Sequence, residues 1–325
     1  MRLRSGIALW SGVAALALSA SSLFAQSYPL KPVRLIVPLP PGGISDNIAR
    51  VLAARLSDAA RQPFIVENRS GANGVLGVEL AAKAPPDGYT LLMGGSGPLS
   101  ILPNLAARLP YDPLKDFAPV ALVGIWPNLL VVHPSVPAST LRELIALARA
   151  KPGSLSYASQ GNGSTGHIAA EKFKQLAGLD IVHIPYKGAA PAAQDVIGGQ
   201  VPMMFDTVMV SMPHVRAGKL RALALTAAQR SPGAPGVPTM TEAGLPGLEI
   251  GAWFGPVAPA GTPRSIVDWL NRETRRVFSD PAERDRLTAQ GAIMALGSPE
   301  DYALHIAQEL DRWGRMIREA GIRGE

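Results

Sequence analysis

Short runs of apolar residues alternate along this chain with longer segments in which apolar positions recur every three or four residues. In the first part, the apolar runs at 33–37, 64–66 and 90–93 are typical of buried strands, and the periodic segments at 46–60 and 73–84 are typical of helices. Strands that alternate with helices indicate a parallel sheet with helices on both faces. The pattern therefore predicts an α/β fold.

A second series of the same kind begins near residue 140. Thr140 and Glu143 have the spacing of a capping box, which predicts a helix that starts at Leu141. Two apolar runs, 120–126 and 129–132, lie between the two series, and we interpret them as a crossing segment. The expected helices of the second series are 141–150, 168–177 and 190–197, and its expected strands are 155–158, 181–184, 203–205 and 220–226.

The last part of the chain does not continue the alternation of strands and helices. A stretch rich in Pro and Gly, 231–247, separates the second series from two predicted helices. Thr262-Pro263 and Ser298-Pro299 each place a capping side chain before a proline, the residue favoured at the first helical position. The final helix, 300–317, has large apolar side chains at helical spacing, which we interpret as core positions and not as a cofactor site: Tyr302, Ile306, Leu310, Trp313 and Ile317.

The first 25 residues predict a secretory signal peptide. Arg2 and Arg4 form a basic start, an apolar stretch covers 7–20, and Ala25 is a small residue suited to cleavage before Gln26. The alternative, a membrane anchor, is disfavoured because the apolar stretch is shorter than the ~20 residues that span a bilayer. We therefore expect a periplasmic protein that is free of the membrane.

The composition of the chain excludes some kinds of chemistry and some kinds of partner. The chain has no cysteine, which removes disulfides, thiolate metal sites and thiol catalysis. About 300 residues remain after signal cleavage, enough for about two domains. The net charge of +6 falls to +4 without the two signal-peptide arginines. Arg272, Arg275 and Arg276 cluster beside acidic residues without interleaved aromatic ones, so we expect a solvated helix face and no nucleic acid.

Two glycine-rich loops carry the main functional signal. Each follows a strand-like run and precedes a helix-like run: residues 38–46 (PLPPGGISD) and 159–167 (SQGNGSTGH). A strand, a glycine turn and a helix start expose backbone N–H groups at the positive end of a helix dipole, which binds small anions such as carboxylates. Two such loops, about 120 residues apart, predict two lobes that close on one anion.

Polar side chains in or near these loops complete the predicted site. Asp46 is better suited to capping the backbone or fixing the loop, with a ligand amine or a bridging water as its alternative partner. Asp206 ends a strand at the expected edge of the site, where a structural and a binding role are both open. The better direct donors to an anion are Ser45, Ser159, Ser164 and Thr165.

Catalytic and cofactor chemistries are disfavoured. The segment 161–166 matches a dinucleotide-binding fingerprint, but it is internal, and the acidic residue expected after the following strand is missing. Ser164 and Ser96 each lack one glycine of the G-x-S-x-G elbow, and the histidines lack metal-ligand spacing. We expect no catalytic residue, metal or cofactor. The alternative is an exported hydrolase with Ser164 as nucleophile and His167 as base.

Further motifs follow in one order along nearly the whole mature chain: PPGGxxDxxAR (40–50), ENRxGA (67–72), PDGYTLL (86–92), GSxxH (163–167), HxPYKG (183–188), WFGP (253–256) and PAGTP (259–263). With these motifs the chain resembles the Bug family of periplasmic binding receptors, the substrate-binding components of tripartite tricarboxylate transporters. The family position that corresponds to Leu39 is usually aromatic, so the identity of the ligand stays open.

The resemblance implies a two-lobed periplasmic binding protein fold of the type II kind. Each lobe would be a mainly parallel sheet flanked by helices, with a cleft between the lobes and two crossing strands. Lobe 1 would combine residues 27–124 and 227–325, and lobe 2 would cover 125–226. The implied function is capture of a small organic carboxylate by hinge closure and delivery, as a monomer, to membrane permease subunits. A receptor that feeds a membrane sensor is the alternative.

The residues expected to bind the ligand come from both loops and from two strand ends. They are Gly42, Gly43, Ser45, Asp46, Ser96, Ser159, Gly163, Ser164, Thr165 and Asp206.

Overall fold

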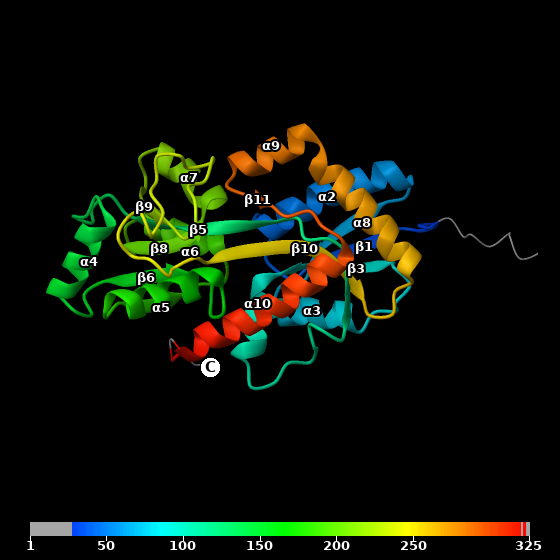
Figure 1. Cartoon of the computed structure of the whole chain (residues 1–325), viewed down its shortest axis with the longest axis horizontal. Coiled ribbons are helices and arrows are strands. Elements are labelled where there is room, and N and C mark those ends of the chain that lie inside the picture. The colour runs from blue at the N-terminus through cyan, green and yellow to red at the C-terminus, as the bar shows by residue number, and fades with distance from the viewer. Residues whose placement is uncertain (1–27, 320, 323–325) are drawn as a thin grey trace, which may run out of the picture.

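The strands of this chain form two groups that are joined through one long strand (Figure 1). The structure is a computed structural model that describes residues 28–319 and 321–322, so the predicted signal peptide lies outside the described residues. Within the described part, no helix is both long enough and apolar enough to cross a bilayer.

The first half is built on three parallel strands, β1 (Val33–Val37), β2 (Phe64–Asn68) and β3 (Thr90–Gly95). The long strand β10 (Gly251–Pro259) lies antiparallel to β3, and the short β4 (Phe117–Pro119) pairs with its end. The strand order β2-β1-β3-β10 places the first predicted β-α-β-α-β series in one sheet, as the sequence predicted.

The second half repeats this plan. Its parallel strands are β6 (Ser156–Ser159), β7 (Val182–Pro185) and β8 (Met203–Thr207), in the order β8-β6-β7. The strand β9 (Arg221–Leu225) does not pair with them directly but lies antiparallel to β5, the strand shared with the first half. All four strands were expected from their apolar runs, within two residues at each end.

The shared strand β5 (Gly124–Val132) belongs to both sheets. Its first residues pair with β10 and with the two-residue strand β11 (Ile293–Met294), and its second part pairs with β8 and β9. The sequence predicted a crossing segment made of two apolar runs, 120–126 and 129–132. Residues 124–132 form one strand, because the backbone stays extended through Pro127 and Asn128.

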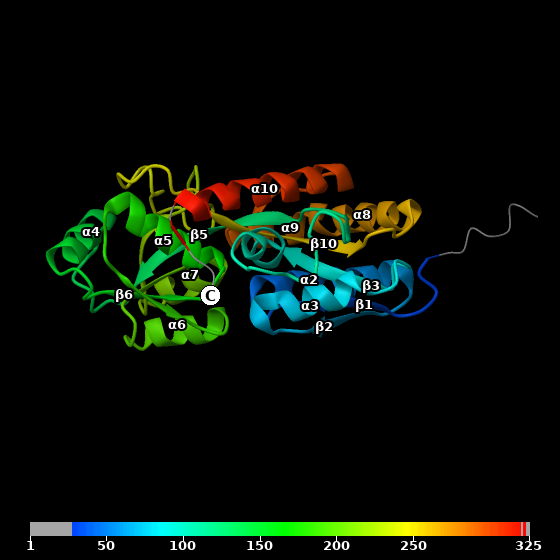
Figure 2. The same cartoon turned by 90° about the horizontal axis from the view of Figure 1, so that it is seen from below.

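Helices cover both faces of both sheets (Figures 1 and 2). In the first half, α2, α8 and α9 pack on one face of the sheet, and α3, η3 and the beginning of α10 pack on the other. In the second half, α4 and α5 cover one face, and α6 and α7 cover the other. The helix bounds are α2 (Ile44–Ala60), η2 (Ala72–Gly74), α3 (Val75–Ala82), η3 (Gly97–Ile101), η4 (Leu102–Asn104), α4 (Leu141–Ala150), α5 (Thr165–Ala177), α6 (Ala189–Ile197), α7 (Val208–Arg216), α8 (Arg264–Ser279), α9 (Pro281–Ala289) and α10 (Pro299–Glu319).

Local capping follows the sequence in most places. The Thr140 hydroxyl accepts a hydrogen bond from the Glu143 N–H (3.2 Å), as the capping box predicted, and the Ser298 hydroxyl accepts one from the Asp301 N–H (3.1 Å). Thr262 differs from its expected role, because its hydroxyl donates to the Pro259 carbonyl and Pro263 takes the N-cap position of α8. The helices α7 and α9 were not expected.

The last helix spans both halves. The helix α10 runs from the first half to the second (Figure 1). Its Tyr302 and Ile306 are buried in the core of the first half, and its Trp313 and Ile317 in the core of the second half. These core positions were predicted from their helical spacing. Part of the segment 227–325, which was expected to belong wholly to lobe 1, therefore packs on the other half.

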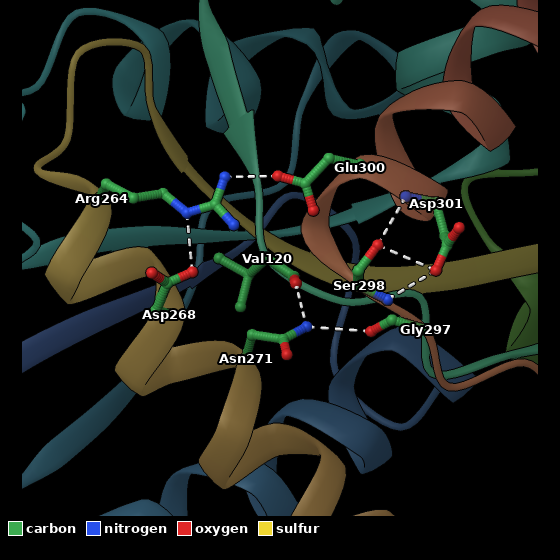
Figure 3. A network of polar contacts seen from close by, with 8 residues as sticks. All are labelled: Val120, Arg264, Asp268, Asn271, Gly297, Ser298, Glu300 and Asp301. Carbon is green, nitrogen blue, oxygen red and sulfur yellow. Dashed lines mark hydrogen bonds and ion pairs between the residues drawn. The ribbon is translucent and has the colours of Figure 1, made fainter.

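A polar network fixes the beginnings of α8 and α10 to the first half (Figure 3). The side-chain amide of Asn271 donates to the carbonyls of Val120 (2.7 Å) and Gly297 (3.0 Å). Arg264 pairs with Asp268 (2.7 Å) and with Glu300, which joins the first turns of the two helices. These ion pairs are exposed and contribute little to stability, whereas Asn271 is buried and holds two backbone carbonyls.

The connections between the halves meet at Thr226. Its hydroxyl accepts from the Asn128 N–H (2.8 Å), and its single proton lies within reach of two carbonyl acceptors, those of Ile250 (2.5 Å) and Asn128 (3.0 Å). The backbone adds bonds from the Thr226 N–H to the Asn128 carbonyl (2.8 Å) and from the Ile250 N–H to the Thr226 carbonyl (3.0 Å). Asn128 is also the residue at which β5 passes from one sheet to the other.

We predict that Thr226→Val destabilises the fold by about 1–3 kcal/mol, because an isosteric methyl group leaves buried backbone groups without their partner. Urea denaturation measures the change in unfolding free energy. The control is Thr241→Val, at an exposed threonine, which should change it by less than about 0.5 kcal/mol. Equal effects of the two substitutions would contradict the role given to the Thr226 hydroxyl.

Candidate functional site

The carboxyl ends of the parallel strands in both halves lead into helix N-termini. The helix α2 follows β1, α5 follows β6, α6 follows β7, and α7 follows β8. In α/β proteins, ligands bind at this edge of a sheet, where loops and helix N-termini face outward. We therefore expect the candidate site among these loops.

Loops of the first half reach loops of the second half at three places. A methyl group added at Gly188 would lie 3.5 Å from Pro40, one at Gly161 would lie 3.1 Å from the Asn73 side chain, and one at Gly97 would lie 3.8 Å from the Gly163 carbonyl oxygen. We call this region the interlobe junction and define it by Pro40, Asn73, Gly97, Gly161, Gly163 and Gly188. Both predicted anion-binding loops contribute to it.

The first loop, 38–46, is held from behind by Asp46. Its carboxylate accepts hydrogen bonds from the Gly42 N–H (3.0 Å), Arg50 Nε (2.9 Å) and the side-chain amide of Asn68 (2.9 Å). Burial raises the pKa of Asp46, but these hydrogen bonds lower it more strongly, so its pKa lies below the ordinary value. The buried carboxylate is therefore ionised at neutral pH and fixes the loop, which is the role that the sequence favoured.

The first backbone N–H groups of α2 have no acceptor within the helix. The N-cap of α2 is Gly43, whose backbone is extended, and the first helical hydrogen bond runs from the Asn47 N–H to the Gly43 carbonyl. The N–H groups of residues 44–46 therefore have no intrahelical partner. The Ser45 hydroxyl is buried and has no hydrogen-bond partner among the residues that the structure describes.

The second loop, 159–167, has the same construction. The Gly163 N–H donates to Nδ1 of His167 (3.2 Å), four residues ahead, as the Gly42 N–H donates to Asp46, and the His167 N–H donates to the Ser164 hydroxyl (3.2 Å). Gly163 has φ +74°, and a side chain there would also strike Leu102 (2.7 Å). A glycine is therefore required at this point of close approach.

Two histidine rings stack behind the second loop. His167 lies 4.3 Å from His183, ring centre to ring centre, and His183 lies 4.7 Å from Tyr157. Nε2 of His183 is 2.7 Å from the Ser159 hydroxyl, which also accepts from the Gly161 N–H (3.2 Å). Burial, aided by His183, lowers the pKa of His167 to about 4, so its ring is neutral at pH 7 and its Nδ1 can accept from Gly163.

This geometry does not form a Ser164 nucleophile with His167 as its base. The Ser164 hydroxyl accepts from the backbone of His167, and Nδ1 of that ring accepts from Gly163. Ser159 has a histidine neighbour, but its side chain is fully buried. Within residues 28–319 and 321–322, no group of three or more acidic or histidine side chains is placed to hold a metal ion.

A third polar cluster lies beside the second loop. Asp206, at the end of β8, accepts from the Thr207 N–H (2.7 Å) and from Nε2 of Gln160 (3.0 Å), and Gln160 also donates to the Phe205 carbonyl (2.9 Å). Burial raises the pKa of Asp206 to about 7, although its hydrogen bonds act in the opposite direction. Asn128 lies opposite Thr207 in the sheet, and its Oδ1 accepts from the Thr165 hydroxyl (3.4 Å).

The structure thus places the predicted residues at the ends of β1, β3, β6 and β8. Ser96 is buried at the N-cap of η3, next to Gly97 of the interlobe junction. The sequence did not single out Gln160, Asn128, Thr207 or His183 as site residues. A signal existed for Asn128, because it is a polar residue that interrupts two apolar runs.

Fold and loops together define a protein of the periplasmic binding type. The family profile described as "Tripartite tricarboxylate transporter family receptor" matches residues 48–322. Protein BugT of Bordetella pertussis is 40% identical over 305 residues, which cover 94% of each chain. The chain therefore belongs to the tripartite tricarboxylate transporter receptor family, as the Bug-like motifs indicated; this is a family of solute-binding receptors and not of enzymes.

Solved structures agree on the fold. An R. palustris protein solved with adipate is 39% identical, with a TM-score of 0.89, and covers 92% of this chain and 100% of its own. MatC from Rhodopseudomonas palustris, solved with bound malate, is 35% identical, with a TM-score of 0.84, and covers 89% of this chain and 100% of its own. The periplasmic binding protein BugD is 33% identical with a TM-score of 0.86, over 92% and 100% of the two chains. The predicted α/β binding-protein fold is confirmed.

We predict that Asp206→Asn changes the pH dependence of stability. The pKa of Asp206 is raised from 3.8 to about 7 in the folded protein, so its contribution to stability is fully present below pH 3.8 and is lost as the pH rises through 7. Asparagine does not titrate, so the variant should gain stability relative to the wild type between about pH 5 and about pH 8.

Urea denaturation of the ligand-free protein at the two pH values measures this difference. The exposed Asp180→Asn serves as the control and should shift stability by the same small amount at both. A pH-independent effect of Asp206→Asn would contradict the raised pKa.

Proposed function

We propose that this protein is a periplasmic receptor that captures a small organic carboxylate between two lobes and delivers it to a tripartite tricarboxylate transporter. The observation that carries the proposal is that two loops of similar construction, one from each half, both contribute residues to the interlobe junction. Each ends in the N-terminus of a long helix, and each has a glycine N–H held by a side chain four residues ahead. Exposed N–H groups at a helix N-terminus favour an anion.

The lobes of the proposal correspond broadly to the two halves. Residues 27–124 and most of 227–325 would form lobe 1, and 125–226 would form lobe 2, with rotation centred on the Thr226 contacts and on β5. Closure would bring the N–H groups of both loops onto one carboxylate. Lobes that rotate about a few residues in connecting segments are one common mechanism of ligand capture.

The ten predicted residues divide by what their side chains contact. Gly43, Ser45, Ser164 and Thr165 would present backbone or hydroxyl donors to the ligand. Gly42 and Gly163 would let the backbone approach the ligand closely, because their own N–H groups are engaged with Asp46 and His167. Asp46 and Ser159 would act through the loops, because their polar atoms are engaged with backbone N–H groups. Ser96 would contribute from the first half, and Asp206 would face a different part of the ligand.

Two neighbours support a carboxylate as the ligand, since one was solved with adipate and another with malate. The family description supports delivery to a transporter, because it names its members as transporter receptors. We infer that the ligand passes unchanged to membrane permease subunits and that the receptor acts as a monomer in the periplasm, after removal of the predicted signal peptide.

Gly43→Val tests this proposal directly. Nothing lies within 4 Å of the position that a Cβ would take at Gly43, and its φ of −82° suits any residue, so the fold should accept the side chain. The branched side chain would stand at the N-cap, where the carboxylate is proposed to sit. We expect carboxylate binding to weaken at least about tenfold, measured by calorimetry with succinate, malate, adipate and citrate.

The matched control is Gly236→Val, because Gly236 also has open space around it and lies away from the loops. Both variants should melt within a few degrees of the wild type. Failure of the wild type to bind any of these acids, or equal binding by Gly43→Val and wild type, would refute the proposed site.

A further inference from the structure

Several buried polar atoms beside the second loop have no hydrogen-bond partner within the described part of the chain, among them the hydroxyl of Thr207 and the side-chain nitrogen of Asn128. Two of these atoms can only accept: Oδ2 of the Asp206 carboxylate and Oε1 of Gln160. Asp206 is only 2% exposed. A buried acceptor without a donor costs about 1–3 kcal/mol, and such groups in native proteins normally have a partner. These two oxygens therefore require an explanation.

The hydrogen-bond network fixes which atoms are free. Nε2 of Gln160 donates to the Phe205 carbonyl (2.9 Å) and to Oδ1 of Asp206 (3.0 Å), so the amide nitrogen faces two acceptors and the amide oxygen must face the other way. Oδ1 of Asp206 also accepts from the Thr207 N–H (2.7 Å). The carboxylate is thus held by one oxygen, which leaves Oδ2 as the free acceptor.

The pair lies at the candidate site and not elsewhere in the core. Gln160 is part of the second loop, and its Oε1 would lie 2.4 Å from a Cβ added at Gly166, in the first turn of α5. Asp206 precedes Thr207, the N-cap of α7. Both acceptors therefore lie beside the beginnings of α5 and α7, and Gln160 is next in sequence to Gly161 of the interlobe junction.

Resting on the proposed carboxylate-binding function, we propose that Asp206 and Gln160 form a second subsite that accepts a hydrogen bond from a hydroxyl or amino group of the ligand. An ionised carboxylate with a free oxygen attracts a donor and repels a second anionic group. The ligand class is therefore a carboxylic acid that also carries a hydroxyl or amino donor, and an unsubstituted dicarboxylic acid binds less well.

Matched pairs of acids test the proposal. Calorimetry compares succinate with malate and aspartate, glutarate with glutamate, and propionate with lactate, at about pH 8.5, where Asp206 is ionised because this pH exceeds its pKa. In at least one pair, the substituted acid should bind about tenfold or more tightly than its parent, the effect of one well-placed hydrogen bond. Parents that bind as tightly as their substituted partners in every pair would overturn the subsite.

Asp206→Asn gives a sharper result, because the amide has the shape of the carboxylate. Thr207 and Gln160 both donate to Oδ1, so the asparagine oxygen should keep that place and its NH₂ group should replace Oδ2. A free acceptor becomes a free donor, and the preference should shift by about tenfold toward the unsubstituted acid. The control is Asp180→Asn, at an exposed aspartate, which should keep the wild-type preference.

The outcomes separate the two proposals. A wild-type protein that binds none of the acids refutes the carboxylate-receptor function itself. Binding without any preference for the substituted acid refutes only the subsite. A preference that persists unchanged in an Asp206→Asn variant that is folded, as a cooperative melting transition shows, assigns the donor contact to other residues and also overturns the subsite.

Discussion

The hydrogen bonds around the Thr226 hydroxyl hold together the segments on which the two-part structure depends. One side chain contacts the backbone of Asn128, where β5 changes sheet, and that of Ile250, just before β10 begins. Because β5 is continuous through this point, each half keeps its own sheet and its own cores on either side of Asn128. The rotation proposed for ligand capture would be centred here, where it would leave the packing within each half intact.

The two loops proposed to bind an anion are held in shape by the same kind of hydrogen bond, which ends on a different side chain in each loop. A glycine N–H donates to a side chain four residues ahead, an ionised carboxylate at Asp46 and a neutral imidazole at His167. Each side chain acts from behind its loop and leaves the first N–H groups of the helix for a ligand. A negative charge at Asp46 close to an anion site is compensated by Arg50 and Asn68, so the loop gains rigidity without directing a free carboxylate oxygen at the ligand.

Much of the fold was predictable because the strands are short, apolar and regularly spaced. The strand at 33–37 and the capped helix at 141–150 were found at their observed bounds. The strand β10 was missed because it contains glycines and prolines, such as Gly255 and Pro256, which are unfavourable in strands. The strand forms because pairing with β3 and β5 outweighs this local preference. Prolines likewise obscured α7, which contains Pro213.

The site was predictable where it depends on backbone and not where it depends on partners across the sheet. Glycine-rich turns before helices are visible in a sequence, so both loops were identified. Asn128 and Thr207 are neighbours only through strand register, and Gln160 contacts Asp206 over 46 positions of sequence. Such long-range contacts leave no local pattern, which is why the cluster around Asp206 emerged only from the structure.

The final helix imposes a mechanical limit on the molecule. Tyr302 near its start and Trp313 near its end are buried in cores that belong to different halves. Between them, the side-chain amide of Asn104 in η4 donates a hydrogen bond to the Leu310 carbonyl (2.9 Å). Because α10 is anchored in both cores, the rotation proposed for ligand capture would have to bend this helix or release one of its anchors. The helix would therefore limit how far the two halves can separate.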